Sequence, residues 1–320
     1  MKIVFAGTPE FALAPLKAAI ESGHEVVGVV TQEDKPQGRK GILTPSPVKA
    51  FALEAGLPVF QPKRIRDELE GLKALGGDVM ITCAYGQILT QGVLDLFPKG
   101  VWNIHAGLLP AYRGASPIQS CILNGERETG VCLMQTELGL DTGDILRCEK
   151  LFIGREETSG ELSARLSLLG ASMLKEELSN IESGNFVLKK QGEDGARVVR
   201  KIGKETAKID FSKSAVEIVN LVRAMNPEPV AYSAVGALKI NVFKALEVDA
   251  GKYIEFTLGR DSAPTAGEIL SEKPKQGLIV ACGENEAVEL CLVQAAGGKP
   301  MRGSDFLNGR KVKKGQVFSC

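Results

Sequence analysis

The sequence lacks a long apolar segment, and its first residues lack the pattern of an export signal. No apolar run approaches the roughly 18–20 residues that a membrane-spanning helix requires. Residues 1–5 lead directly into a strand-like stretch, without a basic segment followed by an apolar one. We therefore expect a cytoplasmic protein without a membrane partner.

Patterns for metal, disulfide and dinucleotide sites are also missing. The seven cysteines include no C-x-x-C pair, and their number is odd. This spacing is typical of reduced, mostly buried thiols, and it predicts neither a zinc site nor a disulfide framework. The turn AGTPE at residues 6–10 is not G-x-G-x-x-G, so we expect no dinucleotide site.

The chain has no net charge, since 39 Lys and Arg balance 39 Asp and Glu, but the charges are unevenly distributed. Residues 186–320 carry 21 basic and 16 acidic side chains, whereas residues 1–185 carry 18 and 23. A basic C-terminal part points to a polyanionic partner. Alternatively, these charges only form a solvated surface without a partner. The same two interpretations apply to the basic loop DKPQGRK at residues 34–40.

The first half of the chain alternates strand-like and helix-like segments. Apolar runs predict strands at residues 2–5, 25–30, 59–60, 78–82 and 101–105. Amphipathic stretches such as residues 10–21 separate these runs. The alternation predicts an α/β fold with a Rossmann-like parallel sheet that is covered on both faces.

The pattern changes near residue 185, and a length of 320 residues fits two domains. A polar, Gly-, Lys- and Arg-rich stretch at residues 186–207 predicts a linker, and a helix is expected at residues 214–225. Short alternating runs at residues 237–242, 277–281 and 288–293 predict a small antiparallel, OB-like β-barrel. The predicted divisions are a catalytic domain at 1–185, the linker at 186–207 and a C-terminal domain at 208–320.

One of the two histidines lies at the end of a predicted strand. His105 ends the run at residues 101–105, and period-two alternation places Asn103 on the same side of the strand. Ligand sites of open α/β sheets lie at the carboxyl ends of the strands, so an amide and an imidazole would face such a site together. A purely structural histidine is the alternative. The other histidine, His24, is expected in a surface turn.

The segment LGLDTGD at residues 138–144 predicts a tight loop. If Asp141 faces His105, its carboxylate would favour the protonated imidazole and orient the ring. A plain turn explains the same residues, and sequence spacing does not choose between the two.

Several segments together resemble a known family. The segments NIH at 103–105, LLPAYRG at 108–114 and DTGD at 141–144 resemble motifs of the folate-dependent formyltransferases. Within that group, FAGTPEFA at 5–12 and KPQGR at 35–39 are similar to segments of the methionyl-tRNA formyltransferases. The resemblance covers nearly the whole chain. One departure is Gly107, where that family usually has serine.

The resemblance implies a reaction and three catalytic residues. A formyl group would pass from 10-formyltetrahydrofolate to the α-amino group of methionyl initiator tRNA, in a bacterial cytoplasm, on a monomeric enzyme without a metal. The Asn103 amide and a protonated His105 would stabilise charge on the formyl oxygen. Asp141 would hold His105 charged and help to move the amine proton.

The resemblance also assigns binding residues. Folate is expected at Ile88, Leu89, Gly107, Leu108, Leu109, Pro110 and Asp144. The tRNA is expected at Lys35, Arg39, Lys40, Arg200, Lys201, Arg302, Arg310 and Lys311. Three alternatives remain open: a formyltransferase that acts on an amino sugar nucleotide, a hydrolase that releases formate, and an RNA-binding protein with an inactive formyltransferase fold.

Overall fold

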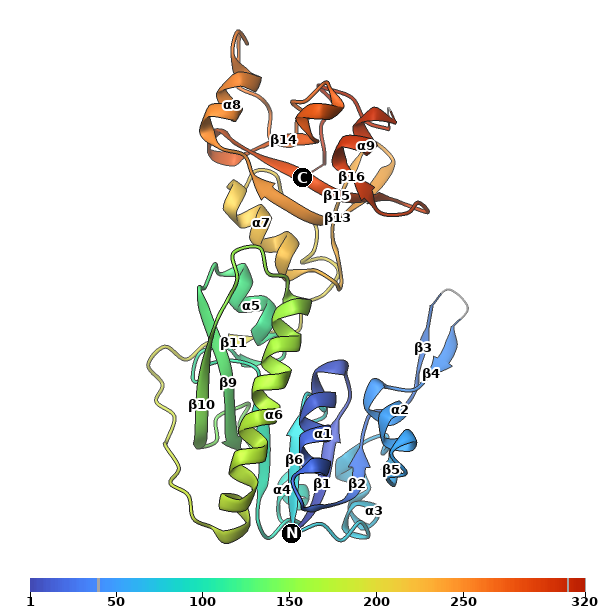
Figure 1. The fold of residues 1–320 in the computed structure, drawn as a ribbon, viewed down its shortest axis with the longest axis vertical. Coiled ribbons are helices and arrows are strands. Elements are labelled where there is room, and N and C mark those ends of the chain that lie inside the picture. The colour runs from blue at the N-terminus through green and yellow to red at the C-terminus, as the bar shows by residue number, and fades with distance from the viewer. Residues whose placement is uncertain (39–40, 310, 320) are drawn as a thin grey trace. The chain divides into compact units, whose positions relative to one another are not determined.

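The computed structural model describes residues 1–38, 41–309 and 311–319, and the chain forms two compact units (Figure 1). The first unit comprises Met1–Pro117, Glu128–Phe152 and Ser163–Arg200, and the second comprises Ile118–Arg127, Ile153–Leu162 and Lys201–Cys320. The chain therefore passes between the units several times. None of the helices in the described ranges is long and apolar enough to cross a membrane.

A seven-stranded sheet forms the centre of the first unit, with the strand order β10-β9-β7-β6-β1-β2-β5. The strands are β1 Lys2–Gly7, β2 Glu25–Val30, β5 Val59–Phe60, β6 Val79–Cys83, β7 Val101–His105, β9 Glu128–Gln135 and β10 Ile145–Phe152. Strands β5, β2, β1, β6 and β7 are parallel, which confirms the fold class predicted from the alternating pattern. Strand β9 is antiparallel to both β7 and β10.

Side chains that alternate along these strands pack against helices on both faces of the sheet. On one face, Val4 and Met80 belong to a buried cluster with Leu72 of α3 (Leu69–Lys73) and Val93 of α4 (Gln91–Leu94). On the other face lie α1 (Leu13–Glu21) and the long helix α6 (Ser159–Ser183), side by side in Figure 1. Burying one such apolar side chain contributes about 1.5–3 kcal/mol.

Helix α6 approaches the sheet closely at a glycine. A Cβ atom at Gly170 would lie 2.8 Å from Cγ2 of Ile104 on β7 and 3.5 Å from Cγ1 of Val131 on β9. A larger residue would therefore push the helix away from the strand that ends in His105.

The antiparallel strands β9 and β10 were not expected from the sequence, and they pair two cysteines. Their register places Cys148 opposite Cys132, and the two residues form a disulfide. The expectation that all cysteines are reduced is therefore wrong for this pair. The register of the two strands brings these cysteines together. Their separation of 16 residues in the sequence does not by itself predict a disulfide.

The second unit contains an antiparallel sheet with the order β12-β13-β15-β14 and with β16 beside β15. Its strands are β12 Ala231–Val235, β13 Leu238–Glu247, β14 Ile279–Cys282, β15 Glu286–Ala295 and β16 Met301–Arg302. Isolated bridges join Val235 to Phe318, Val317 to Glu268, and Ile269 to Val280. Because these bridges connect the edge strands β12 and β14, the sheet closes on itself, in agreement with the predicted small barrel.

The helix predicted at residues 214–225 is α7 (Ala215–Ala224), and it begins with a capping box. Ser214 Oγ accepts from the backbone N–H of Glu217, and the Glu217 carboxylate accepts from the backbone N–H of Ser214. Such a cap contributes about 1 kcal/mol. The other described strands and α-helices are β3 Lys35–Gln37, β4 Ile42–Thr44, α2 Pro47–Glu54, β8 Arg113–Gly114, α5 Pro117–Leu123, β11 Val198–Val199, α8 Ala250–Thr257 and α9 Gly303–Asn308.

We expect non-reducing peptide mapping of the purified, oxidised protein to find Cys132 linked to Cys148. Reduction should lower the free energy of unfolding by up to about 3 kcal/mol, because a cross-link over a loop of this length restricts the unfolded chain. A Cys291→Ser control should respond to the reductant as the wild type does. Alkylation of both paired thiols in native, unreduced protein would contradict the pairing.

Candidate active site

The carboxyl end of β7 carries the half-buried Asn103 and the buried His105, which is 5% exposed. Thr82 Oγ1, on the neighbouring strand β6, donates to Asn103 Oδ1 at 2.9 Å. On the other side of the amide, Nδ2 donates to Oδ1 of Asp141 at 3.4 Å, and because a carboxylate only accepts, this contact sets the orientation of the amide. The amide N–H group therefore faces the loop that follows β9.

Asp141 in that loop brings the predicted catalytic residues together. Its Oδ2 accepts from the backbone N–H of Gly114 at 2.8 Å and lies 3.6 Å from Nδ1 of His105. Its φ of +51° lies in the left-handed region, which a non-glycine residue rarely adopts. Ala84 and Tyr112, at φ of +47° and +59°, do the same in adjacent segments. Such backbone strain tends to gather at functional sites.

The surroundings of His105 determine its protonation state. Nε2 lies 3.0 Å from the carbonyl oxygen of Tyr112, and because a carbonyl only accepts, Nε2 carries a hydrogen and donates. Burial lowers the pKa of His105, while the Asp141 carboxylate and the Tyr112 carbonyl oppose this shift. The family resemblance implied a protonated His105. The structure instead favours a neutral imidazole in the free protein, with Nδ1 unprotonated, because burial outweighs the neighbouring carboxylate.

The residues predicted to bind folate lie in several places. A Cβ atom at Gly107 would lie 3.0 Å from Nε2 of His105, so a serine here would require the ring to shift slightly. Leu109 donates its backbone N–H to Cys132 Sγ at 3.4 Å. Ile88 is 84% exposed, whereas Leu89 packs against the core cluster around Met80. Leu108, Pro110 and Asp144 are half-buried.

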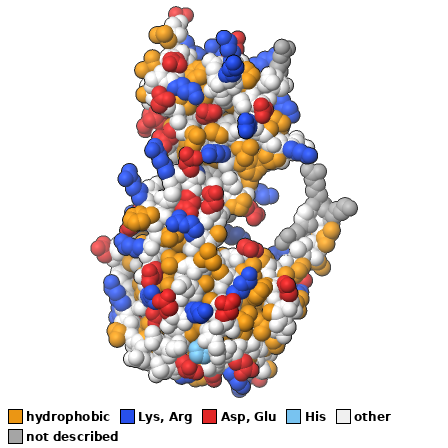
Figure 2. All heavy atoms as spheres, in the orientation of Figure 1, with side chains coloured by type: hydrophobic (Ala, Val, Ile, Leu, Met, Phe, Trp, Pro, Cys, Tyr) orange, Lys and Arg blue, Asp and Glu red, His pale blue; other side chains and the backbone are white. Residues whose placement is uncertain are grey.

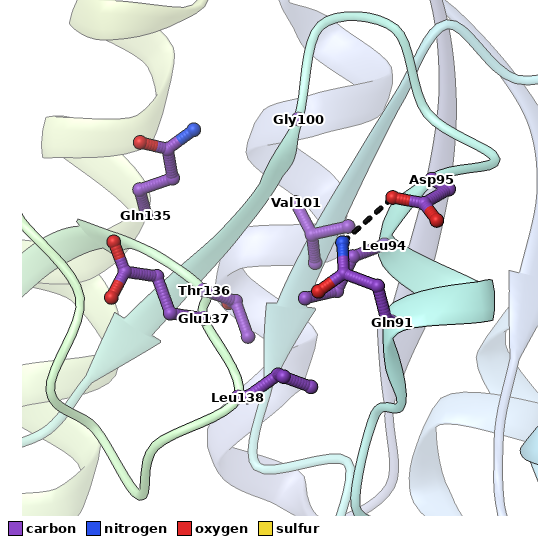
Figure 3. Close-up of a pocket in the computed structure, with 9 residues that line it drawn as sticks. All are labelled: Gln91, Leu94, Asp95, Gly100, Val101, Gln135, Thr136, Glu137 and Leu138. Carbon is purple, nitrogen blue, oxygen red and sulfur yellow. Dashed lines mark hydrogen bonds between the residues drawn. The ribbon is translucent and has the colours of Figure 1, made fainter.

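An open pocket of about 450 Å³ lies at the first residue of β7 (Figure 3). Its lining residues are Gln91, Leu94, Asp95, Gly100, Val101, Gln135, Thr136, Glu137 and Leu138. Leu94, Val101 and Leu138 are apolar, and the buried Thr136 Oγ1 has no hydrogen-bond partner within the described structure. The pocket therefore combines a few apolar side chains with several polar groups that could orient a ligand. The seven residues predicted to bind folate are not among those that line it.

The residues predicted to bind tRNA are distributed over both units. Arg39, Lys40 and Arg310 lie outside the described residues. Lys35, Arg200, Lys201, Arg302 and Lys311 are exposed. On the face drawn in Figure 2, Lys and Arg side chains are interspersed with Asp and Glu. The basic side chains visible on that face are therefore dispersed.

Several groups around the three central residues were not predicted. They are the Thr82 hydroxyl, the Tyr112 carbonyl, the Gly114 N–H and the Gln191 amide. The segment at 112–114 was singled out by its motif, but backbone groups leave no signal in residue type. Across residues 1–38, 41–309 and 311–319, no group of three His, Cys, Asp or Glu side chains could hold a metal ion.

Comparison with known proteins assigns the chain to a family. The formyl transferase family matches residues 1–178, and the C-terminal domain of formyl transferases matches residues 201–311. A methionyl-tRNA formyltransferase from Xanthomonas campestris pv. campestris is 44% identical over 314 residues, which cover 97% of this chain and 98% of the relative. The chain belongs to the methionyl-tRNA formyltransferase family. A second member, from Coxiella burnetii, is 42% identical over 315 residues, or 98% of this chain and 96% of the relative.

Solved structures share the formyltransferase fold at lower identity. An N-formyltransferase from Helicobacter canadensis, in complex with folinic acid and dTDP-3-aminofucose, is 19% identical with a TM-score of 0.64, covering 90% of this chain and 98% of that one. HypX from Aquifex aeolicus, in complex with tetrahydrofolic acid, is 17% identical with a TM-score of 0.64, covering 98% of this chain and 48% of that one. At these identities, the likeness concerns the fold alone.

The lowered pKa of His105 predicts how the stability of this formyltransferase depends on pH. In the unfolded chain histidine titrates near 6.5, so between about pH 5.5 and 7 the unfolded state binds more protons than the folded state. The free energy of unfolding should therefore fall as the pH decreases through this window. His105→Gln should flatten the slope, and the control His24→Gln should retain it. Equal slopes in the wild type and His105→Gln would contradict a buried, neutral His105.

Proposed function

We propose that this formyltransferase transfers a formyl group from 10-formyltetrahydrofolate to the α-amino group of methionyl initiator tRNA. One observation carries the proposal: Asn103, His105 and Asp141 meet in a chain that is 42–44% identical, over nearly its whole length, to methionyl-tRNA formyltransferases. The reaction prepares the initiator tRNA for translation, and we place it in the bacterial cytoplasm, on a monomeric enzyme.

The pocket beside β7 is proposed to hold the pterin ring of the donor. Leu94, Val101 and Leu138 offer apolar walls to a flat ring, and Thr136 Oγ1 is a buried hydroxyl that still needs a partner. When bound, the donor supplies a formyl carbon that exchanges its bond to a folate nitrogen for a bond to the acceptor amine. The amine gives up one proton, and the leaving folate nitrogen takes one up. The segment at 107–110, together with Ile88, Leu89 and Asp144, is proposed to contact the rest of the donor.

The loop at residues 136–144 connects this pocket to the catalytic residues, because its first residues line the pocket and Asp141 follows them. Asn103 would stabilise the charge that develops on the formyl oxygen, since Thr82 holds its Oδ1 and Asp141 accepts only one of the two hydrogens on Nδ2. Loss of one such donor typically lowers the rate by about 10²- to 10³-fold.

His105 and Asp141 would together handle the amine proton. Nδ1 of His105 faces the Asp141 carboxylate at 3.6 Å, and burial lowers the pKa of the ring, which favours an unprotonated Nδ1 in the resting state. A proton that leaves the amine, directly or through water, can be taken up by Asp141 or at Nδ1. The resulting imidazolium is then stabilised by the adjacent carboxylate. General acid–base assistance of this kind contributes about 10²- to 10⁴-fold.

Basic side chains are proposed to bind the tRNA backbone. Lys35, Arg39 and Lys40 would lie near the acceptor end of the tRNA. Further along the chain, Arg200, Lys201, Arg302, Arg310 and Lys311 would contact phosphates. Because such contacts release counterions, affinity for the tRNA should fall steeply as the salt concentration rises.

A formylation assay with two acceptors tests the proposal. Purified protein and 10-formyltetrahydrofolate are mixed with either methionyl initiator tRNA or an amino sugar nucleotide, and the products are identified by mass. We expect formylated methionyl-tRNA, at a rate that decreases with salt. His105→Ala should lower the rate by orders of magnitude while folate still binds.

Formylation of the sugar nucleotide alone would be consistent with the proposed catalytic residues, but it would overturn the assignment of the tRNA as acceptor. Formate released without any acceptor would indicate the hydrolase. The absence of every product, with tRNA still bound, would indicate an inactive RNA-binding protein.

A further inference from the structure

The side chain of Gln191 contacts the loop that carries Asp141. Its Nε2 donates to the carbonyl oxygen of Asp141 at 2.9 Å and to that of Gly143 at 2.7 Å. The two hydrogens of this amide group are therefore both donated, one to the carbonyl oxygen on each side of Thr142. Gln191 belongs to residues 189–199, here called the strap, which the sequence places within the predicted linker at 186–207.

The strap is anchored on both sides of Gln191. On one side, the backbone of Lys189 exchanges two hydrogen bonds of 2.8 Å with Ile145, the first residue of β10. On the other side, β11 (Val198–Val199) pairs with β8 (Arg113–Gly114). The backbone around Gln191 therefore has little freedom to move away from the loop.

Arg113 fixes the orientation of the Gln191 amide. The guanidinium Nε of Arg113 donates to Gln191 Oε1 at 3.1 Å. Arg113 itself is buried, with 5% exposure. Because Oε1 accepts from Arg113, Nε2 must point to the carbonyls of the loop. The next residue, Gly114, donates its backbone N–H to the Asp141 carboxylate at 2.8 Å. Strand β8 thus holds the side chain of Asp141 directly and its backbone through Gln191.

We propose that Gln191 is a positioning residue that keeps the Asp141 carboxylate against His105 and Asn103. The need for it follows from the backbone of Asp141, whose φ of +51° is maintained only by surrounding contacts. Without the two hydrogen bonds from Gln191, the loop can relax to an ordinary conformation, and the carboxylate leaves Nδ1 of His105. A displacement of about 1 Å in an active site typically lowers the rate by about 100-fold.

Gln191→Met removes both donors and keeps the length of the side chain. The kinetic test of this inference rests on the proposed function. Activity is therefore measured with the acceptor that the wild-type protein formylates. We expect kcat to fall by about 10- to 100-fold and KM to change much less, because Gln191 itself does not line the pocket. The control is Asp194→Asn, an exposed position in the strap, which should keep the wild-type kcat.

A double-mutant cycle separates positioning from a general structural role. If Gln191 acts through Asp141, Gln191→Met should cause almost no further loss of kcat in an Asp141→Asn background. Fully additive losses would show that Gln191 does not act through Asp141 and would overturn the inference.

Amide hydrogen exchange provides a readout that does not depend on activity. Peptides that cover residues 138–144 should exchange faster in Gln191→Met than in the wild type, while peptides from β1 and β6 stay unchanged. Unchanged exchange of the loop would overturn the inference, even if the wild type proved inactive on tRNA and the proposed function failed. If Gln191→Met does not fold, Gln191→Asn retains the amide but is one methylene shorter, and it should show the same faster exchange.

Discussion

The carboxylate of Asp141 is the point at which the elements of the first unit meet. It accepts from the Gly114 N–H at 2.8 Å and lies 3.4 Å from Asn103 Nδ2 and 3.6 Å from His105 Nδ1. Strand β7 supplies the amide and the imidazole, β8 supplies the backbone donor, and β9 leads into the loop that carries the acid. Each of these groups is useful only while the loop keeps its left-handed conformation at Asp141.

Burial and charge act on His105 in opposite directions. The buried site lowers the pKa of His105, and the Asp141 carboxylate partly offsets this effect. The balance leaves the ring neutral and able to take up a proton, beside a carboxylate that stabilises the charge once it forms. A fully exposed imidazole would lack the low dielectric that strengthens this interaction, and one buried without Asp141 would resist protonation more strongly.

Local patterns predicted the parallel strands, the helix at α7 and the placement of Asn103 and His105, because period-two and helical spacing report directly on which face is buried. Features that depend on distant partners were not predictable in this way. The Cys132–Cys148 disulfide depends on the register of β9 and β10, and the role of Gln191 depends on a strap that returns to the sheet. The expectation of a protonated His105 considered only the neighbouring carboxylate, whereas burial, which lowers its pKa, is a tertiary property.

The most direct measurement is the single-turnover rate of formyl transfer by Asp141→Asn, with enzyme in excess over methionyl-tRNA and with donor saturating. We expect the rate to fall by about 10²- to 10⁴-fold while both substrates still bind, because the amide cannot accept the proton or stabilise a charged His105. A rate within twofold of the wild type would contradict the central role of the Asp141 carboxylate.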